Sequence, residues 1–149
     1  MRLSIDRRKE FAESVRKHLG AVLATEELVL LEAGEGKFRA TTTEALETAS
    51  MMKGVQLVGL YVGKKRGELT TLTIEGCMLI AEIDARYVVE LTKEQALVWM
   101  KGGPVKVDAQ SRAVIGKYKR FYLGTALVDR LGNAYPQIPL WRRIPPAVE

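Results

Sequence analysis

Two stretches of the sequence place cationic side chains directly beside aromatic rings. The stretch Lys117–Tyr122 (Lys-Tyr-Lys-Arg-Phe-Tyr) interleaves three cations with three aromatic residues, and Trp141 is followed by Arg142 and Arg143. Cations neutralise phosphates and aromatic faces stack on bases, so this combination is typical of surfaces that bind single-stranded or looped RNA. A strand with one face in solvent produces the same alternation, and both interpretations of the pattern stay open.

The sequence contains few residues that could act as a nucleophile or general base, with one cysteine and one histidine. The single cysteine, Cys77, lies in the apolar stretch Gly-Cys-Met-Leu-Ile, which predicts a buried and unreactive thiol. The single histidine, His18, falls at the end of a predicted helix, where an imidazole interacts with the helix dipole. One cysteine excludes an intrachain disulfide and a cysteine-cluster metal site, and no glycine-rich phosphate loop is present. We therefore expect no enzyme activity, no catalytic residues, no metal and no cofactor.

The positive charge is concentrated in the second part of the chain. Residues 1–85 carry 12 Lys and Arg against 13 Asp and Glu, whereas residues 86–149 carry 11 against 5. An excess confined to one part indicates a partner that is a polyanion, of which nucleic acid is the commonest example. Two basic groups in the first part are explained better by solvation of a helix face or turn than by contact with an anion. They are the helix face with Arg7, Arg8, Lys9, Arg16 and Lys17, and the run Lys64–Arg66.

No apolar run reaches the length of about 18 residues that a membrane-spanning helix needs. The first residues lead into a charged helical pattern rather than an apolar signal segment. The sequence therefore predicts a cytoplasmic protein without a membrane partner.

The first part of the chain predicts an α+β domain over residues 1–85. A helix over 4–19 has Phe11, Val15 and Leu19 on one face and ends at Gly20. Two strands at 28–31 and 38–42 are joined by a glycine turn, and a helix capped by Thr43 follows at 43–52. Two further strands at 55–63 and 69–74 flank a basic turn, and the apolar run 77–83 is expected as a strand in the middle of the sheet. These elements give a mostly antiparallel sheet with helices.

The second part predicts a smaller, β-rich domain over residues 86–149. A strand over 87–91 precedes a helix capped by Thr92, whose Ala96, Leu97 and Met100 are expected to face inward while Trp99 lies at a boundary. The remaining strands are expected at 105–107, 113–115, 123–128 and 138–144, with a turn at 129–133.

The order of elements after residue 86 resembles a PUA domain, a small RNA-binding pseudobarrel. The features that carry the resemblance are the short helix, the turn at Gly102-Gly-Pro-Val-Lys106 and the glycine-centred strand Leu123-Gly-Thr-Ala-Leu-Val128. Together with Leu57-Val-Gly-Leu-Tyr-Val-Gly63 and the run Tyr87–Gly103, the chain is similar to the large-subunit ribosome-biogenesis factors of the Nip type, found in archaea and eukaryotes. These factors have a pre-PUA α/β domain followed by a C-terminal PUA domain. The turn here lacks the second Pro-Gly that PUA domains usually carry.

The resemblance implies a non-catalytic protein that binds RNA, with pre-ribosomal RNA of the large subunit as the expected ligand and no DNA. It also implies that the N-terminal domain docks a protein partner, such as a ribosome-assembly protein. Two alternatives stay open: an accessory RNA-binding subunit of a tRNA or rRNA modification system, and a protein-interaction adaptor with a basic surface. The residues expected to contact RNA are Lys101, Gly102, Gly103, Lys106, Arg112, Lys117, Lys119, Arg120, Trp141, Arg142 and Arg143.

Overall fold

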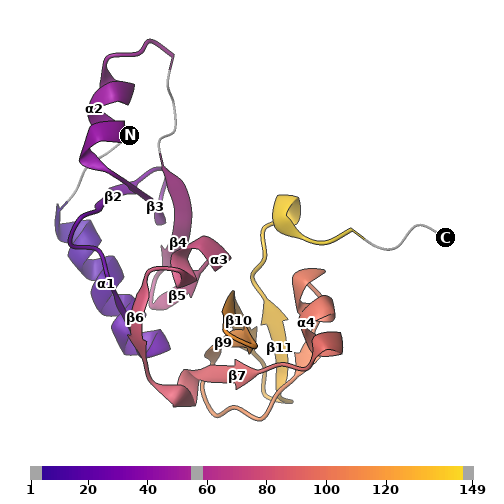
Figure 1. Ribbon diagram of the computed structural model, residues 1–149. Coiled ribbons are helices and arrows are strands. Elements are labelled where there is room, and N and C mark those ends of the chain that lie inside the picture. Colours follow the sequence, from indigo (N-terminus) through magenta and orange to yellow (C-terminus); the bar gives the residue numbers. More distant parts are fainter. Residues whose placement is uncertain (1–4, 55–58, 146–149) are drawn as a thin grey trace.

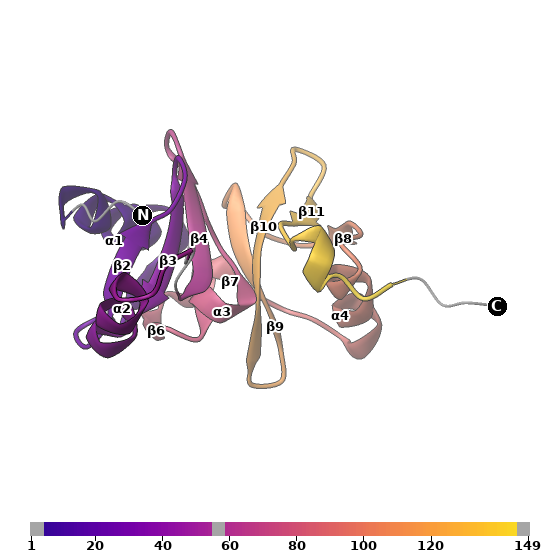
Figure 2. The ribbon, with the colours of Figure 1, turned by 90° about the horizontal axis from the view of Figure 1, so that it is seen from above.

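The computed structural model describes residues 5–54 and 59–145 and has an α+β architecture built on three sheets (Figure 1). The α+β class predicted from the sequence is thereby confirmed. The N-terminal elements gather on one side of the molecule and the C-terminal elements on the other (Figures 1 and 2). No helix within the described ranges is long and apolar enough to cross a membrane.

A four-stranded antiparallel sheet forms the centre of the N-terminal side. Its strands are adjacent in the order β2 (Val29–Glu32), β3 (Lys37–Thr41), β4 (Leu60–Arg66) and β5 (Leu69–Leu72). Helix α1 (Ile5–Leu19) packs against it through the predicted face of Phe11, Val15 and Leu19, all fully buried. The ring of Phe11 stacks on Phe38 of β3 with centroids 4.4 Å apart. The helical period of the sequence therefore identified the correct buried stripe.

The basic run Lys64–Arg66 belongs to β4, not to the turn that the sequence predicted. Lys65 pairs with Thr70 and Arg66 with Leu69, so the chain reverses at Gly67 and Glu68. Gly67 has a φ of +63°, which glycine adopts without the steric cost of a side chain. The predicted strand over 55–63 begins at residue 60 in the described chain, and residues 55–58 lie outside it.

The apolar run 77–83 is not a central strand, which corrects the prediction. Thr73 caps the short helix α3 (Ile74–Cys77) by accepting a hydrogen bond from the Gly76 amide, so Cys77 ends a helix. The strand that follows, β6 (Ile80–Ile83), pairs only with β1 (Ala21–Leu23) in a separate two-stranded antiparallel sheet. A local cap thus decided the conformation over a run of apolar residues that fits either state.

Helix α2 (Thr43–Ser50) stands away from the rest of the molecule at the top of Figure 1. Its N-cap is Thr42 rather than the predicted Thr43, because the Thr42 hydroxyl accepts from the Ala45 amide at 3.1 Å. None of its residues is buried, and Met51 and Met52 after it are exposed.

A curled five-stranded sheet forms the C-terminal side, here called sheet C. Its order is β7 (Val88–Glu90), β9 (Ala113–Tyr118), β10 (Phe121–Val128), β11 (Asn133–Pro136) and β8 (Val105–Lys106). Strands β7 and β9 are parallel and the other neighbours are antiparallel. The one-turn 3-10 helix η1 (Ala85–Tyr87) leads into β7, and a second, η2 (Leu140–Arg142), follows β11.

Sheet C separates two hydrophobic clusters, one on each face. Ala113 and Ile115 of β9 face the cluster that contains Phe11 and Phe38. Val114 of the same strand faces a second cluster with Trp99 and Ala126. The alternation along one strand thus contributes to both cores. The predicted domain boundary between residues 85 and 86 stays a prediction, because strand β9 of sheet C contributes residues to the hydrophobic clusters of both sides.

Helix α4 (Lys93–Met100) begins with a capping box in which Thr92 and Gln95 exchange hydrogen bonds between side chain and backbone. Ala96 is buried and Met100 packs against the second cluster, as predicted. Leu97 is exposed instead of buried, and Trp99, expected at a boundary, is fully buried. Trp99 lies over Gly116 and its Nε1 donates to the Leu123 carbonyl at 2.9 Å.

The predicted last strand over 138–144 is wrong. Leu140–Arg142 form η2 instead, with Pro139 at its N-cap, and β11 ends at Pro136. Proline lacks the amide hydrogen that a strand would donate, so the two prolines interrupt the ladder. The predicted turn over 129–133 is confirmed, since Asp129 accepts hydrogen bonds from the amides of Leu131 and Asn133 at 2.9 Å each.

Candidate functional site

The basic and aromatic stretch 117–122 forms the tip of the β9–β10 hairpin. Tyr118 pairs with Phe121 and Lys117 pairs with Tyr122, so the chain reverses at Lys119 and Arg120. Lys119 has a φ of +54°, the left-handed conformation that a two-residue hairpin turn requires. Residues directly opposite each other project to the same face of a sheet, so Tyr118 and Phe121 form an aromatic pair on one face.

Each of the three cations of this tip lies over an aromatic ring. The distances from charge to ring centroid are 5.6 Å for Lys117 over Tyr122 and 5.5 Å for Lys119 over Tyr118. Arg120 lies 5.2 Å from the centroid of Phe121, whose side chain is 54% exposed. Cation–π contacts of this kind hold positive charge beside the rings. Lys117 is also paired with Glu90 at 3.8 Å, so the parts of the hairpin tip that are exposed to solvent are Lys119, Arg120 and Phe121.

One face of the hairpin tip, with Tyr118 and Phe121, is the face of sheet C on which α4 packs, whereas Lys117 and Tyr122 lie on the opposite face. Gly116 and Tyr118 alternate onto the face on which Trp99 packs, because Trp99 lies over Gly116. Phe121 and Leu123 share that face on the neighbouring strand, and the Leu123 carbonyl accepts from Trp99. Trp99 is thus a core residue and does not take part in the exposed aromatic surface.

Lys101, Gly102 and Arg143 come together at the end of α4. The Ile144 amide donates to the Met100 carbonyl at 2.9 Å, which brings the segment after η2 against the helix end. Gly102 has a φ of +81°, and a Cβ atom there would lie 2.6 Å from Nε of Arg143. Gly103 is similarly close to Val98, at 2.9 Å. The space beside both glycines is therefore filled by side chains of the protein itself.

Arg142 is paired with a residue of the N-terminal side. Its Nη2 lies 2.8 Å from Oε1 of Glu75 in α3, and the two side chains are 38% and 20% exposed. Arg143 donates from Nε to the Ile138 carbonyl at 2.9 Å. Both arginines predicted to contact RNA thus already hold the C-terminal segment in place.

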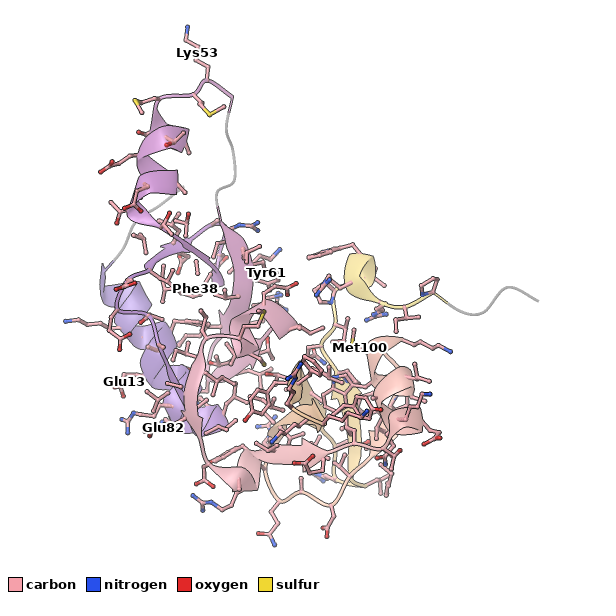
Figure 3. All side chains as sticks on the ribbon, viewed as in Figure 1. Glu13, Phe38, Lys53, Tyr61, Glu82 and Met100 are labelled. Carbon is pink, nitrogen blue, oxygen red and sulfur yellow. The ribbon has the colours of Figure 1, made fainter. Side chains whose placement is uncertain are left out.

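Trp141 stands at the edge of a cleft between η2 and the β3–β4 part of the N-terminal sheet. Its side chain is 72% exposed, and the cleft of about 420 Å³ is also lined by Lys37, Arg39 and Tyr61. Figure 3 shows Tyr61 on the side of β4 that faces η2. Burial raises the pKa of Tyr61, an effect opposed by the positive charges of Arg39 and Arg66. An exposed indole beside two cations offers the same combination of stacking and charge as the hairpin tip.

Lys106 and Arg112 lie far from the hairpin tip along sheet C. Strands β9, β10 and β11 form a meander, so the turn at 129–132 and the loop before β9 are at the opposite end from Lys119 and Arg120, as Figure 2 shows. Lys106 donates from Nζ to the Leu131 carbonyl at that end. The predicted RNA-binding residues therefore form separate groups at the hairpin tip, at the end of α4 with η2, and at the opposite end of sheet C.

Cys77 is 2% exposed, and burial raises its pKa to about 12, which fits the predicted unreactive thiol. Within the described ranges, no three His, Cys, Asp or Glu side chains gather in a way that would hold a metal ion.

Several residues of these groups were not foreseen. Glu75, which binds Arg142, and Lys37, Arg39 and Tyr61, which line the cleft beside Trp141, are distant in sequence from the residues they meet. The charge of residues 1–85 did not point to these residues, because the net charge of that part is close to zero.

Comparison with protein-family models and with curated proteins gave no match to this chain.

Proposed function

We propose that this protein is a non-catalytic RNA-binding protein that acts on pre-ribosomal RNA in assembly of the large ribosomal subunit. The observation that carries the proposal is the β9–β10 hairpin tip, where the exposed cations Lys119 and Arg120 lie over aromatic rings at 5.5 and 5.2 Å. Phosphate neutralisation combined with base stacking is how proteins bind single-stranded nucleic acid. The cytoplasmic location expected from the sequence is part of the same proposal.

The architecture of the C-terminal side supports a PUA-type assignment. A small curled sheet with one parallel pair of strands and a short helix over one face is compatible with such a pseudobarrel. The ribosome-biogenesis context depends on the similarity of sequence to the factors of the Nip type. The surface chemistry by itself supports RNA binding of any source.

The N-terminal side is proposed to dock a protein partner. Helix α2 buries none of its residues, and the chain after it exposes the methionines Met51 and Met52. Flexible methionine side chains adapt to the surface of a partner. Binding of an acidic protein by the basic C-terminal side is the competing interpretation, and the salt dependence of RNA binding distinguishes it.

The test compares two pairs of substitutions in the full chain. Lys119→Ala with Arg120→Ala removes two cations from the hairpin tip, and Arg130→Ala with Lys93→Ala removes two exposed cations elsewhere. The probe is a fluorescently labelled single-stranded RNA, and its affinity is measured by anisotropy between low and moderate salt. Each phosphate contact on a single strand contributes a slope of about −0.7 in log affinity against log salt, so two lost contacts weaken binding by roughly 25-fold at about 0.1 M salt.

The hairpin pair is expected to reduce both the affinity and the salt slope, by about 1.4 units of slope, while the control pair leaves the slope unchanged. Phe121→Ala should add a loss of about 1 to 3 kcal/mol without altering the slope, because stacking releases no counterions. Equal behaviour of the hairpin and control pairs would remove the hairpin from the proposed surface. Absence of measurable binding by the unmodified protein would refute the proposed function itself.

A further inference from the structure

A second basic cleft lies between the N-terminal and C-terminal sides, at the end of sheet C away from the hairpin tip. Its volume is about 470 Å³, and cations line it from three separate elements. Lys17 and His18 come from the last turn of α1, Arg66 from the end of β4, and Arg112 from the loop before β9. From the sequence alone, the basic residues around Lys17 and Arg66 were better explained by solvation than by contact with an anion. Folding brings both beside Arg112.

The cations of this cleft are available to a ligand. Within the described residues, the side chains of Lys17, Arg66 and Arg112 form no ion pair and no hydrogen bond. One acidic residue, Glu68, lines the same cleft. The cations at the end of α1 offset the partial negative charge of the helix terminus. That effect explains neither Arg66 nor Arg112, which come from other elements.

The cleft continues into a neighbouring hollow along α1. This second hollow, of about 350 Å³, shares Lys17, His18 and Glu68 with the first and adds Lys65. In it, Arg16 is paired with Glu13 at 2.8 Å and Lys65 donates to the Gly67 carbonyl. The unpaired cations therefore lie in the first cleft, and the second hollow extends its length along the molecular surface.

The other side chains of the cleft suit an RNA backbone. Ser111 and Tyr87 are also among the lining residues, and arginine, lysine, serine and tyrosine are side chains that contact phosphate oxygens in nucleic-acid complexes. Two arginines offer planar forks that bind phosphate through two hydrogen bonds each. A concave site with this lining favours a phosphodiester chain over a flat acidic protein surface.

We propose that this cleft binds the sugar-phosphate backbone of RNA through Lys17, Arg66 and Arg112, as a second contact site used together with the hairpin tip. The inference rests on the proposed function. It assigns RNA contact to both sides of the molecule, because two of the three cations, Lys17 and Arg66, belong to the N-terminal side. RNA held at both sites would pass from one end of sheet C to the other. The N-terminal side then contacts RNA in addition to any protein partner.

The experiment measures binding of one labelled single-stranded RNA of about 24 nucleotides, longer than the 4 to 16 nucleotides that one small RNA-binding fold covers. Lys17→Ala, Arg66→Ala and Arg112→Ala are combined in the full chain. The matched control combines Lys53→Ala, Lys93→Ala and Arg130→Ala, which remove the same charge from exposed positions outside both hollows. Lys53 lies beyond α2 and points away from the body of the molecule (Figure 3).

The cleft variant should weaken binding by about 100-fold at roughly 0.1 M salt and reduce the salt slope by about 2, the effect of three lost contacts. The control variant should leave the slope unchanged. Circular dichroism checks the fold of each variant. Glu68→Gln supplies a test that misfolding cannot imitate, because removing the one acidic side chain of the cleft should raise the affinity.

Cleft and control variants of equal affinity, with an unchanged affinity for Glu68→Gln, would overturn the second site and leave the charges to solvation or to an acidic protein. If Lys119→Ala with Arg120→Ala still weakens binding in that case, the proposed function stands and only this inference fails. If the unmodified protein binds no RNA, both fail together.

Discussion

The ion pair between Arg142 and Glu75 predicts that Arg142 stabilises the fold, whereas the sequence led us to expect that Arg142 contacts RNA. The two atoms lie 2.8 Å apart, and the side chains are 38% and 20% exposed. An exposed pair contributes about 0.2 to 1 kcal/mol, while removing one partner of a buried pair costs about 3 to 5 kcal/mol. Because this pair is intermediate in burial, we expect a coupling energy of about 1 to 2 kcal/mol between the two side chains.

The perturbation is a double-mutant cycle of Arg142→Ala, Glu75→Ala and the combined variant. Arg142→Ala should destabilise more than Glu75→Ala, since Glu75 is the more buried partner and its carboxylate is left without the guanidinium. Urea unfolding followed by far-ultraviolet circular dichroism measures each free energy of unfolding. This readout avoids the fluorescence of Trp141, whose ring lies 6.0 Å from Arg142.

The same cycle separates a structural arginine from one that binds RNA. If Arg142 holds η2 against α3, Glu75→Ala releases the guanidinium and should raise RNA affinity, by up to about fivefold for one added phosphate contact at roughly 0.1 M salt. A combined loss of stability equal to the sum of the two single losses, within about 0.3 kcal/mol, would show that the two side chains are not coupled. That result would refute the proposed anchoring of η2.

Two further substitutions test the packing around α4. Trp99→Phe should lower the free energy of unfolding by about 2 kcal/mol in urea titration, because it leaves the Leu123 carbonyl without the indole donor; an unchanged midpoint would contradict the assigned hydrogen bond. Gly102→Ala should cost about 2 kcal/mol, of which about 1 comes from the positive φ and about 1 from displacing Arg143. Gly67→Ala is the matched control, with a φ of +63° and no atom within 4 Å of the added carbon, so an equal loss of stability in both variants would mean that Arg143 does not fill the space.

Much of the fold could be predicted because its signals are local. The stripe of Phe11, Val15 and Leu19 lies within one helix, and the cap at Thr92 needs only Gln95 three residues later. The turn after β10 is likewise set by Asp129, whose carboxylate accepts from amides two and four residues on. Each of these features depends on residues within a few turns or positions of one another.

The errors arose where a distant element decided between two local possibilities. Helix α4 has only two turns, and its apolar residues lie around most of its circumference, so the sequence pattern placed Leu97 inward and Trp99 at a boundary, the reverse of what the fold shows. Gly116 on β9 leaves the space that Trp99 fills, and the carbonyl that accepts the Trp99 hydrogen bond, that of Leu123, is on β10. The strand expected over 138–144 failed for a different reason, because Pro139 cannot donate to a strand ladder and instead begins η2, whose Leu140 and Trp141 are exposed.

The candidate site likewise contains features that are local in the sequence and features that depend on a distant residue. The hairpin tip was predictable, since its cations and rings are neighbours in sequence. Arg142 illustrates the limit, because its charge is visible in the sequence and its partner Glu75 is not. A cation counts toward a polyanion site only when no carboxylate holds it, and that condition is a property of the fold.

The basic cleft shows the opposite effect of folding. Lys17 lies among interleaved acidic residues on α1, and Arg66 ends a basic run that solvation of a predicted turn explained, so neither was assigned to a site from the sequence. The fold places Lys17 and Arg66 together in the cleft, with Glu68 as its one acidic lining residue, and adds Arg112 from the other side of the molecule. Net charge by segment therefore assigned the RNA-contacting role to residues 86–149 alone, whereas a potential summed over nearby charges is set by their positions in space. The variant that removes Lys17, Arg66 and Arg112 tests whether that potential, and not the charge of the segment, decides where RNA binds.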